Sequence, residues 1–242
     1  MKTNRQRIFR VGLTLALAAV AIAPAAADDF TADFDIGQCK FEPNGRQNPY
    51  FSLEPGDRST FEGEEEGAAV RLEITVENET RTIVFKNPDG ATKSIQARLV
   101  VEREWHDGEV VEISRNWFSR CRQTHDVFYF GESVDLFENG QVVSHEGSWL
   151  AGADGAQPGI IIPARFLLGS RYFQEQAPGV ALDRAEHVDM GLTVKAAGKT
   201  FRHCVEVSET SALSRGESTK IYCPGVGLLM DDEVTLTDFR RD

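Results

Sequence analysis

The chain lacks any apolar run long enough to cross a membrane. Its longest, from Val11 to Ala23, falls short of the roughly 20 residues that a spanning helix needs. Basic residues such as Lys2 and Arg10 precede this run, and three alanines follow it before Asp28. The pattern is typical of a secretory signal peptide. We expect residues 1–27 to be removed, leaving a periplasmic or secreted protein without a membrane span.

Basic residues are scarce throughout the chain. Its 26 Lys and Arg residues stand against 38 Asp and Glu residues, which gives a net charge of −12 at pH 7. Such an excess of negative charge repels nucleic acid and anionic lipid. We therefore expect no nucleic-acid partner, and we interpret the charge as a source of solubility.

Sustained helical periodicity is also missing. Short runs rich in β-branched and aromatic residues alternate instead with turn signals, among them Asp107-Gly108 and Asn139-Gly140. Both dipeptides fit two-residue hairpin turns, which need positive φ at each position. The sequence thus predicts an all-β protein with one domain over residues 48–242, preceded by an N-terminal tail over residues 28–47. The domain is expected to be an antiparallel meander that forms a curved sheet or incomplete barrel.

The hairpin around Asp107-Gly108 has a mixed pattern. If its ladder is unbroken, Arg103 faces Glu112 and Val101 faces Ser114. Each face then carries both charged and apolar side chains, so neither is a clean core. We interpret this hairpin as extending beyond the core.

The sequence contains four cysteines and no Cys-x-x-Cys pair. An even number in an exported chain indicates disulfides rather than zinc or redox chemistry. Three pairings are possible. The turn signal at Leu213–Gly216 lies midway between Cys204 and Cys223, so a hairpin there would join those two and leave Cys39 with Cys121.

Three motifs occur in a particular order. The opening NPYFSLEPGDRSTFEG and the closing pair GKTFRHCVEV and IYCPGVGLL frame a central block, GSWLAGADGAQPGIIIP, from Gly147 to Pro163. From Asn48 to Met230 the arrangement resembles an uncharacterised family of secreted or lipoprotein-type exported bacterial β-proteins. The resemblance implies a curved antiparallel sheet or incomplete barrel and carries no characterised reaction. The cysteines and the missing lipid-attachment cysteine depart from the family pattern, so a shared function should depend on neither.

The central block is too long for a simple hairpin turn. Long connections in compact domains are usually lids, binding loops or disordered segments, and the apolar triplet Ile160–Ile162 argues against disorder. We expect the segment 147–163 to cover the open side of the sheet. Trp149 would be its buried anchor, and Asp154 would lie at its bend.

Polar residues near this segment are the best site candidates. Two carboxylates at a cleft could act as acid and base, and oxygen ligands could hold calcium, although no calcium-loop spacing is present. Both alternatives compete with ordinary turn residues on an acidic protein, as does the acidic run at Glu64. The histidines are scattered, so we predict no metal site, and no catalytic residue can be assigned. The candidate ligand-binding residues are Glu132, Asp135, His145, Glu146, Trp149 and Asp154.

These observations favour a non-enzymatic exported binding protein. It would hold a small or amphipathic ligand, or a peptide, under the segment 147–163. Two alternatives stay open. One is a hydrolase or lyase that uses Glu132 with Glu146 or Asp154, and the other is an envelope protein that binds a partner at a sheet edge.

Overall fold

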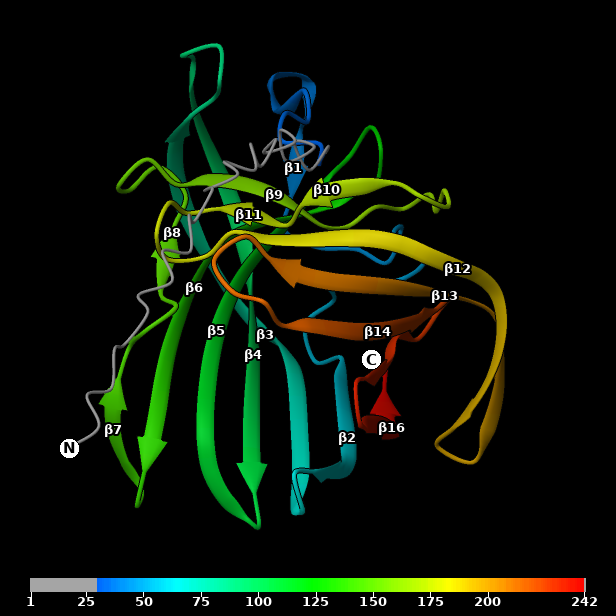
Figure 1. Ribbon diagram of the computed structural model, residues 1–242. Coiled ribbons are helices and arrows are strands. Elements are labelled where there is room, and N and C mark those ends of the chain that lie inside the picture. The colour runs from blue at the N-terminus through cyan, green and yellow to red at the C-terminus, as the bar shows by residue number, and fades with distance from the viewer. Residues whose placement is uncertain (1–29, 242) are drawn as a thin grey trace, which may run out of the picture.

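The computed structural model describes residues 30–241, which are mostly β-strand (Figure 1). The signal peptide predicted over residues 1–27 lies outside the described residues. Within them, helical structure is confined to one short 3-10 helix, η1, at Ile36–Gln38. Over residues 30–241, no helix has the length and apolar character needed to cross a membrane.

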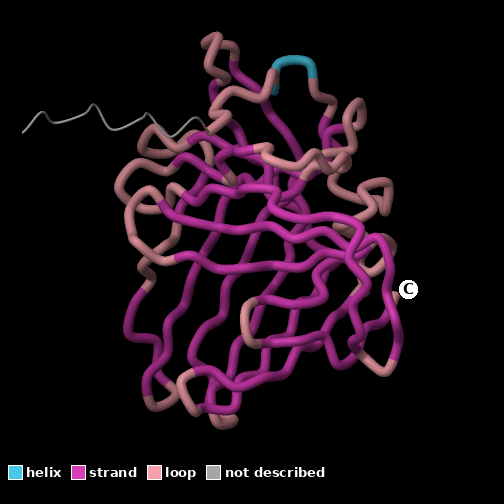
Figure 2. Tube along the Cα trace, turned by 45° about the vertical axis from the view of Figure 1, so that its right-hand side comes forward, coloured by secondary structure: helices cyan, strands magenta, loops and turns pink. Residues whose placement is uncertain are grey.

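The strands form one antiparallel sheet that curves strongly around its own axis (Figure 2). Their order in the sheet is β10-β12-β13-β14-β15-β16-β2-β3-β4-β5-β6-β9-β11, with β1 beside β5, and β7 and β8 beside β6. The bounds are β1 Phe41–Glu42, β2 Arg58–Glu65, β3 Ala68–Lys86, β4 Thr92–His106, β5 Glu109–Cys121, β6 Val127–Glu138, β7 Gln141–Ser144, β8 Trp149–Leu150, β9 Gln157–Ile162, β10 Arg171–Phe173, β11 Glu175–Gln176, β12 Asp183–Ala196, β13 Lys199–Ser211, β14 Glu217–Cys223, β15 Gly227–Asp231 and β16 Val234–Arg240.

The sheet nearly closes into a barrel along one short stretch of chain. The two ends of the strand order, β10 and β11, are separated only by Gln174. Since β10 pairs with β12 and β11 pairs with β9, this stretch joins the two sides of the sheet. The pairing of β12 with β10 ends at Glu186, and beyond it the barrel opens (Figure 1). The prediction of an all-β, antiparallel, incompletely closed barrel is confirmed.

The two predicted hairpin turns are present. Asp107 and Gly108 have φ values of 50° and 84°, and Asn139 and Gly140 have values of 52° and 73°. These positive values suit Gly, Asn and Asp, which tolerate the left-handed region better than other residues do. The local sequence therefore determines where β4 turns into β5 and where β6 turns into β7.

The register of the β4–β5 hairpin differs from the prediction. A β-bulge next to Glu104 pairs Glu104 with Glu112 and Glu102 with Ser114. The predicted pairing of Arg103 with Glu112 is wrong because it assumed an unbroken ladder, and one extra residue moves the following side chains to the other face. Glu102, Glu104 and Glu112 consequently lie on the same face of the sheet.

Aromatic side chains pack on both faces of the closed end. Inside, Phe118 stacks on Tyr129 with ring centroids 4.7 Å apart. Outside, Phe41 of β1 lies edge-on to Phe128 and Phe130, at 5.3 and 5.1 Å. The N-terminal segment thus covers the outer face of β6 at its start, which explains why the first five residues of this strand are all buried. A second core lies where β15, β16 and β2 meet β13.

Both predicted disulfides are present. Cys39 is bonded to Cys121, 82 residues away, and Cys204 to Cys223, 19 residues away. The first attaches the N-terminal segment to the end of β5, next to the pairing of Phe41 with Cys121. The second joins β13 to β14 within the second core.

Candidate functional site

The lid expected over residues 147–163 is not formed, because this stretch belongs to the sheet. Trp149 of β8 pairs with Glu132 of β6, and Ile162 of β9 pairs with Val127 of the same strand. Residues 151–156 form a tight turn between them, in which Gly152 N donates to Ala156 O at 2.9 Å. A ligand is therefore not held under this segment.

Close packing explains two of the four glycines of the central block, Gly152 and Gly159. A Cβ atom on Gly152 would lie 2.4 Å from Val84 O, and one on Gly159 would lie 2.3 Å from Phe173 O. Both distances are far shorter than a van der Waals contact. Gly152 thus allows the turn to approach β3, and Gly159 allows β9 to approach the β10–β11 stretch. The requirement is one of chain packing, not of ligand binding.

Trp149 is buried, as the sequence predicts, with 7% of its surface exposed. It lies opposite Glu132 in the ladder and therefore on the same face of the sheet, and its indole ring lies edge-on to Tyr129 at 5.1 Å. Among residues 30–241 its Nε1–H group has no hydrogen-bond partner. A buried donor without a partner is costly, so packing has to compensate for it.

The remaining candidates do not share this position. Asp135 accepts a hydrogen bond from Arg115 at 2.7 Å and lies 2.9 Å from exposed His145. The hydrogen bond from Arg115 lowers the pKa of Asp135. Glu146 and Asp154 are exposed, and Asp154 occupies the turn with a φ of 49°.

The pair of carboxylates expected from Glu132 with Glu146 or Asp154 is not formed. Glu132 faces the inside of the barrel, half-buried, whereas both of its expected partners face solvent. Of the six candidates, only Glu132 and Trp149 meet on the inner face.

Glu132 belongs instead to a group of three acidic side chains on the inner face, which we call the interior carboxylates: Glu102, Glu112 and Glu132. They come from the adjacent strands β4, β5 and β6, where Glu102 lies opposite Ser114 and Glu132 lies opposite Asn116. No Lys, Arg or His within residues 30–241 forms an ion pair with any of the three.

The interior carboxylates hold their protons unusually tightly. Withdrawal from water, together with the charges of Glu102 and Glu112, raises the pKa of Glu132 to about 8. Withdrawal from water likewise raises the pKa of Glu102 to about 7, although Lys220 opposes this. Each of the three side chains is half-buried. The site is therefore an acidic surface without a compensating cation.

Lys220 does not supply that cation. Its Nζ lies 3.2 Å from Glu209 and 3.3 Å from Asp231. Burial lowers the pKa of Lys220, but the two carboxylates outweigh this and raise it well above its usual value. The charge of Lys220 is thus balanced by its ion pairs with Glu209 and Asp231.

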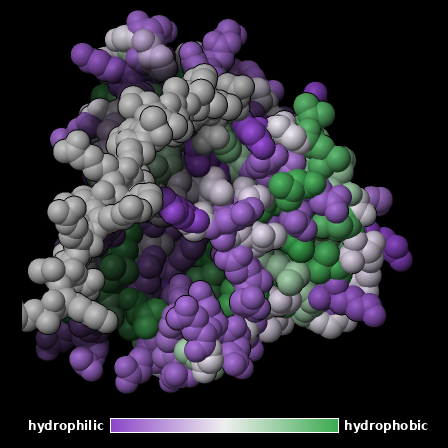
Figure 3. Space-filling model, in the orientation of Figure 1, coloured by the Kyte–Doolittle hydropathy of each residue, from purple (hydrophilic) through white to green (hydrophobic). Residues whose placement is uncertain are grey.

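A cavity of about 110 Å³ lies next to these groups. Its lining combines charged side chains, among them Glu102, Lys220 and Asp231, with apolar ones such as Val100 and Leu228. Hydrophilic and hydrophobic residues also lie side by side in the hollowed face seen in Figure 3. The cavity alone is smaller than the 300–1,000 Å³ typical of drug-sized ligands, so only a small group fits inside it.

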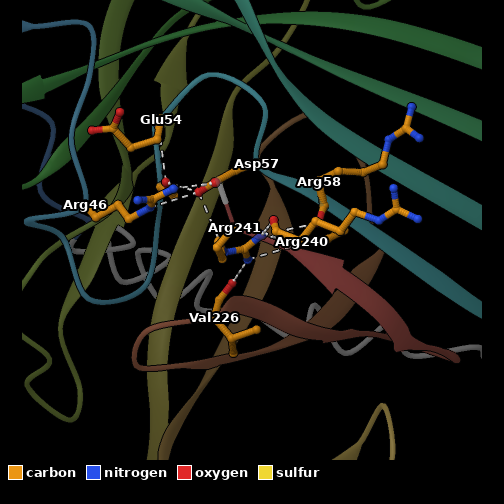
Figure 4. Close-up of polar contacts among 9 residues, drawn as sticks. Arg46, Glu54, Asp57, Arg58, Val226, Arg240 and Arg241 are labelled. Carbon is orange, nitrogen blue, oxygen red and sulfur yellow. Dashed lines mark hydrogen bonds and ion pairs between the residues drawn. The ribbon is translucent and has the colours of Figure 1, made fainter.

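A polar cluster closes one end of this cavity (Figure 4). Asp57, which is 2% exposed, lies 2.6 Å from Arg46 and accepts a 2.6 Å hydrogen bond from Ser52. Arg241 lies 3.7 Å from Asp57 and donates to Val226 O. These contacts hold the turn before β2 against β15, so we assign the cluster a structural role.

The structure also groups Glu65, Glu104 and His106, although the sequence predicts no metal site. Their ligand atoms lie within 4.8 Å of one another, and His106 Nε2 is 2.6 Å from Glu104 Oε1. Carboxylate and imidazole groups at this spacing can hold a divalent cation. The same contact also serves as an ion pair between half-exposed side chains.

The acidic interior implies a distinct pH dependence of stability. The folded state keeps the protons of Glu102 and Glu132 up to a pH of about 7 and 8, while the unfolded chain loses them near 4.5. The free energy of unfolding should therefore fall as pH rises through this range. After allowing for partial solvent access, we expect a loss of about 1–2 kcal/mol between pH 6.5 and 8.5.

Urea denaturation at several pH values measures this effect. The opposite contribution of His187, whose pKa burial lowers to about 4, acts below pH 6.5 and leaves the upper range clear. Glu132→Gln should remove most of the fall in the free energy of unfolding with pH. Glu146→Gln, at an exposed position, should leave this pH dependence unchanged. Stability that stays constant or rises from pH 6.5 to 8.5 would contradict the assignment.

Comparison with known proteins adds little to this geometry. No family model matches the chain, and no curated protein is similar to it in sequence. Among solved structures, a candidate lipoprotein from Parabacteroides distasonis ATCC 8503 is 11% identical. The match covers 82% of this chain and 100% of that one, with a TM-score of 0.34. A similarity this low supports no inference about function, and the family resemblance noted from the sequence stays a prediction.

Proposed function

We propose that this protein is a non-enzymatic exported binding protein that takes one small amphipathic molecule into the open part of its barrel. The observation that carries the proposal is the cavity next to Glu102, whose lining combines apolar side chains with charged ones such as Lys220 and Asp231. A site that combines apolar walls with a few polar groups is typical of ligand pockets.

The position of the cavity supports the same function. It lies between the inner face of β2–β5 and strands β14 and β15, so rigid paired strands supply its walls. The cavity has a volume of about 110 Å³, so it accommodates one small molecule or one small group of a longer one. A small molecule with one polar end therefore suits this part of the barrel better than a peptide does.

Native mass spectrometry of protein purified from the periplasm tests this function. We expect a 1:1 complex whose additional mass is released when the protein is denatured. Val100→Phe should abolish the complex because it fills the cavity. Val84→Phe, at a position that is 56% exposed, provides the matched control. A measured mass equal to that of the polypeptide alone would overturn the proposal.

The alternative at a sheet edge has less support. β7 has only four residues, and the ladder of β12 contains three irregularities along its length. Short strands and bulges are the usual means by which proteins prevent another chain from pairing. The hydrolase alternative required Glu132 to lie next to Glu146 or Asp154, and Glu132 faces the inside of the barrel whereas the other two face solvent.

A further inference from the structure

Two groups of strands line the cavity of about 110 Å³. In the pairing of β14 with β15, Tyr222 lies opposite Leu228 and Lys220 lies opposite Asp231, and all four residues border the cavity. Strands β3, β4 and β5 contribute apolar side chains, which are Ile74, Val76, Val100 and Phe118. A ligand in the cavity therefore meets apolar surface together with the side chains of Lys220 and Tyr222.

The hydroxyl group of Tyr222 is a hydrogen-bond donor without an acceptor. The residue is 5% exposed, and its hydroxyl makes no hydrogen bond within residues 30–241. Its oxygen borders open space, whereas the unpartnered nitrogen of Trp149 is enclosed by protein. Burial, with the charge of Glu209, raises the pKa of Tyr222 well above its usual value, so the hydroxyl keeps its proton. A ligand that supplies an acceptor would remove the cost of this unpaired donor.

Lys220 supplies a second donor on the same face of β14, two residues away. Its ammonium group carries three N–H donors. Nζ lies 3.2 Å from Glu209 and 3.3 Å from Asp231, and it contacts no other acceptor within the described part of the chain. At least one N–H group therefore stays available to a ligand.

The charges around these two donors select a neutral ligand. Lys220 carries one positive charge against the negative charges of both Glu209 and Asp231, so a carboxylate or phosphate would be repelled. An ammonium group has only donors, so it could not accept a hydrogen bond from Tyr222 or from Lys220. A neutral molecule with an acceptor oxygen meets both requirements.

We propose that the molecule in the cavity is a neutral carbonyl compound, whose oxygen accepts hydrogen bonds from Tyr222 and Lys220 and whose apolar part packs against β3–β5. This inference rests on the proposed function and names the chemical class of its ligand. A carbonyl oxygen has two lone pairs for the two donors, whereas a hydroxyl group adds a hydrogen that needs an acceptor of its own. Burial lowers the pKa of Lys220, but Glu209 and Asp231 raise it well above its usual value. The amine is therefore protonated, and it binds the carbonyl group without attacking it.

Glu102, which also borders the cavity, should make this binding depend on pH. It has no hydrogen bond or ion pair within residues 30–241, and withdrawal from water raises its pKa to about 7, although Lys220 opposes this. Below that pH its carboxyl group is a third donor, and above it the carboxylate repels a carbonyl oxygen. The charged groups on other strands that influence Glu102 are Lys220 on β14, Asp231 on β15, Glu112 on β5, Glu209 on β13 and Glu132 on β6. Affinity for a carbonyl compound should therefore fall by up to about tenfold from pH 6 to pH 8.

NMR titration at pH 6 with four molecules built on the same ring tests the proposal: cyclopentanone, cyclopentanol, cyclopentylamine and methylenecyclopentane. An apolar cavity of about 150 Å³ holds benzene in another protein, so a smaller five-membered ring suits this one. We expect cyclopentanone to bind about tenfold more tightly than methylenecyclopentane and the amine, and about threefold more tightly than the alcohol. If any of the other three binds as tightly, the proposed function stands and the carbonyl inference fails. If none of the four binds, the inference fails, and the native mass spectrum alone decides the proposed function.

Two tyrosine variants localise the interaction. Tyr222→Phe removes only the hydroxyl group, so it should weaken binding of cyclopentanone about fivefold or more and leave binding of methylenecyclopentane unchanged. Tyr172→Phe is the matched control, because Tyr172 is equally buried, its hydroxyl contacts His187 at 3.1 Å, and it does not border the cavity. Circular dichroism will show whether each variant is folded.

Glu102→Gln provides a third variant, because its amide donates a hydrogen bond at every pH. It should retain binding of cyclopentanone and abolish the pH dependence. Three results would overturn the inference: unchanged binding of cyclopentanone by Tyr222→Phe, an equal loss in Tyr172→Phe, or an affinity of the original protein that rises with pH.

Discussion

Replacement of Trp149 by alanine should lower the free energy of unfolding by about 3–5 kcal/mol. The indole is buried against Tyr129, and the residue pairs β8 with β6 opposite Glu132. Truncation would leave a cavity at the junction of β6 with the turn over residues 151–156. Chemical denaturation of the variant beside the original protein measures the loss.

Two matched variants separate packing from hydrogen bonding at this position. Trp149→Phe keeps an aromatic ring and removes the unpartnered Nε1–H, so its cost should stay below about 2 kcal/mol. Asp154→Asn, in the exposed turn of the same segment, should change stability by less than about 1 kcal/mol, because Asn tolerates positive φ as well as Asp does. An unchanged midpoint for Trp149→Ala would show that the segment is not anchored as described.

Removal of the Cys39–Cys121 disulfide should cost about 4 kcal/mol when both residues are replaced by alanine. The bond closes a loop of 82 residues, so it restricts the unfolded chain strongly. It also fixes β1 on β5, where Phe41 covers the rings of Phe128 and Phe130. Loss of the bond should therefore expose this aromatic surface as well.

The second disulfide provides the internal comparison. Cys204 and Cys223 close a loop of only 19 residues between strands that already pair, so the double alanine variant should lose about 3 kcal/mol. Denaturation of both variants under identical conditions gives the difference directly. A larger loss for the Cys204–Cys223 variant would mean that packing in the second core outweighs restriction of the unfolded chain.

The sequence predicts the features of this fold that depend on local chemistry. Asp107-Gly108 and Asn139-Gly140 specify their turns because few residues tolerate positive φ. The spacing around Leu213–Gly216 predicts the hairpin that pairs Cys204 with Cys223, and the remaining cysteines then follow. These inferences need only neighbouring residues and counting.

Features that depend on long-range packing could not be predicted from the sequence. The bulge at Glu104 has no clear local signal, yet it decides which face Glu112 occupies. Without it, alternation places Glu102 and Glu112 on different faces, and the interior carboxylates cannot be recognised. The glutamates at 102 and 104, two residues apart in a β-strand, were the available hint of an acidic face.

The central block is a second case in which long-range packing could not be predicted from the sequence. Its glycines and its length suggest a binding loop, but Gly152 and Gly159 are required by contacts with β3 and the β10–β11 stretch. Those contacts join segments that are distant in the chain. Trp149 and Glu132, two of the candidate residues, are neighbours because their strands pair, not because a loop covers the sheet.

The strand order also determines which strand pairings require a long loop to close during folding. Along the path from β10 to β11, neighbouring strands are close in sequence, with the exception of β16 and β2. There Thr237 donates a hydrogen bond to Thr60 O across 177 residues. The entropic cost of closing a loop rises with its length, and non-local pairings slow folding. Along this path, the topology thus places the longest loop closure at the pairing of β16 with β2, far along the chain from the stretch that nearly closes the barrel.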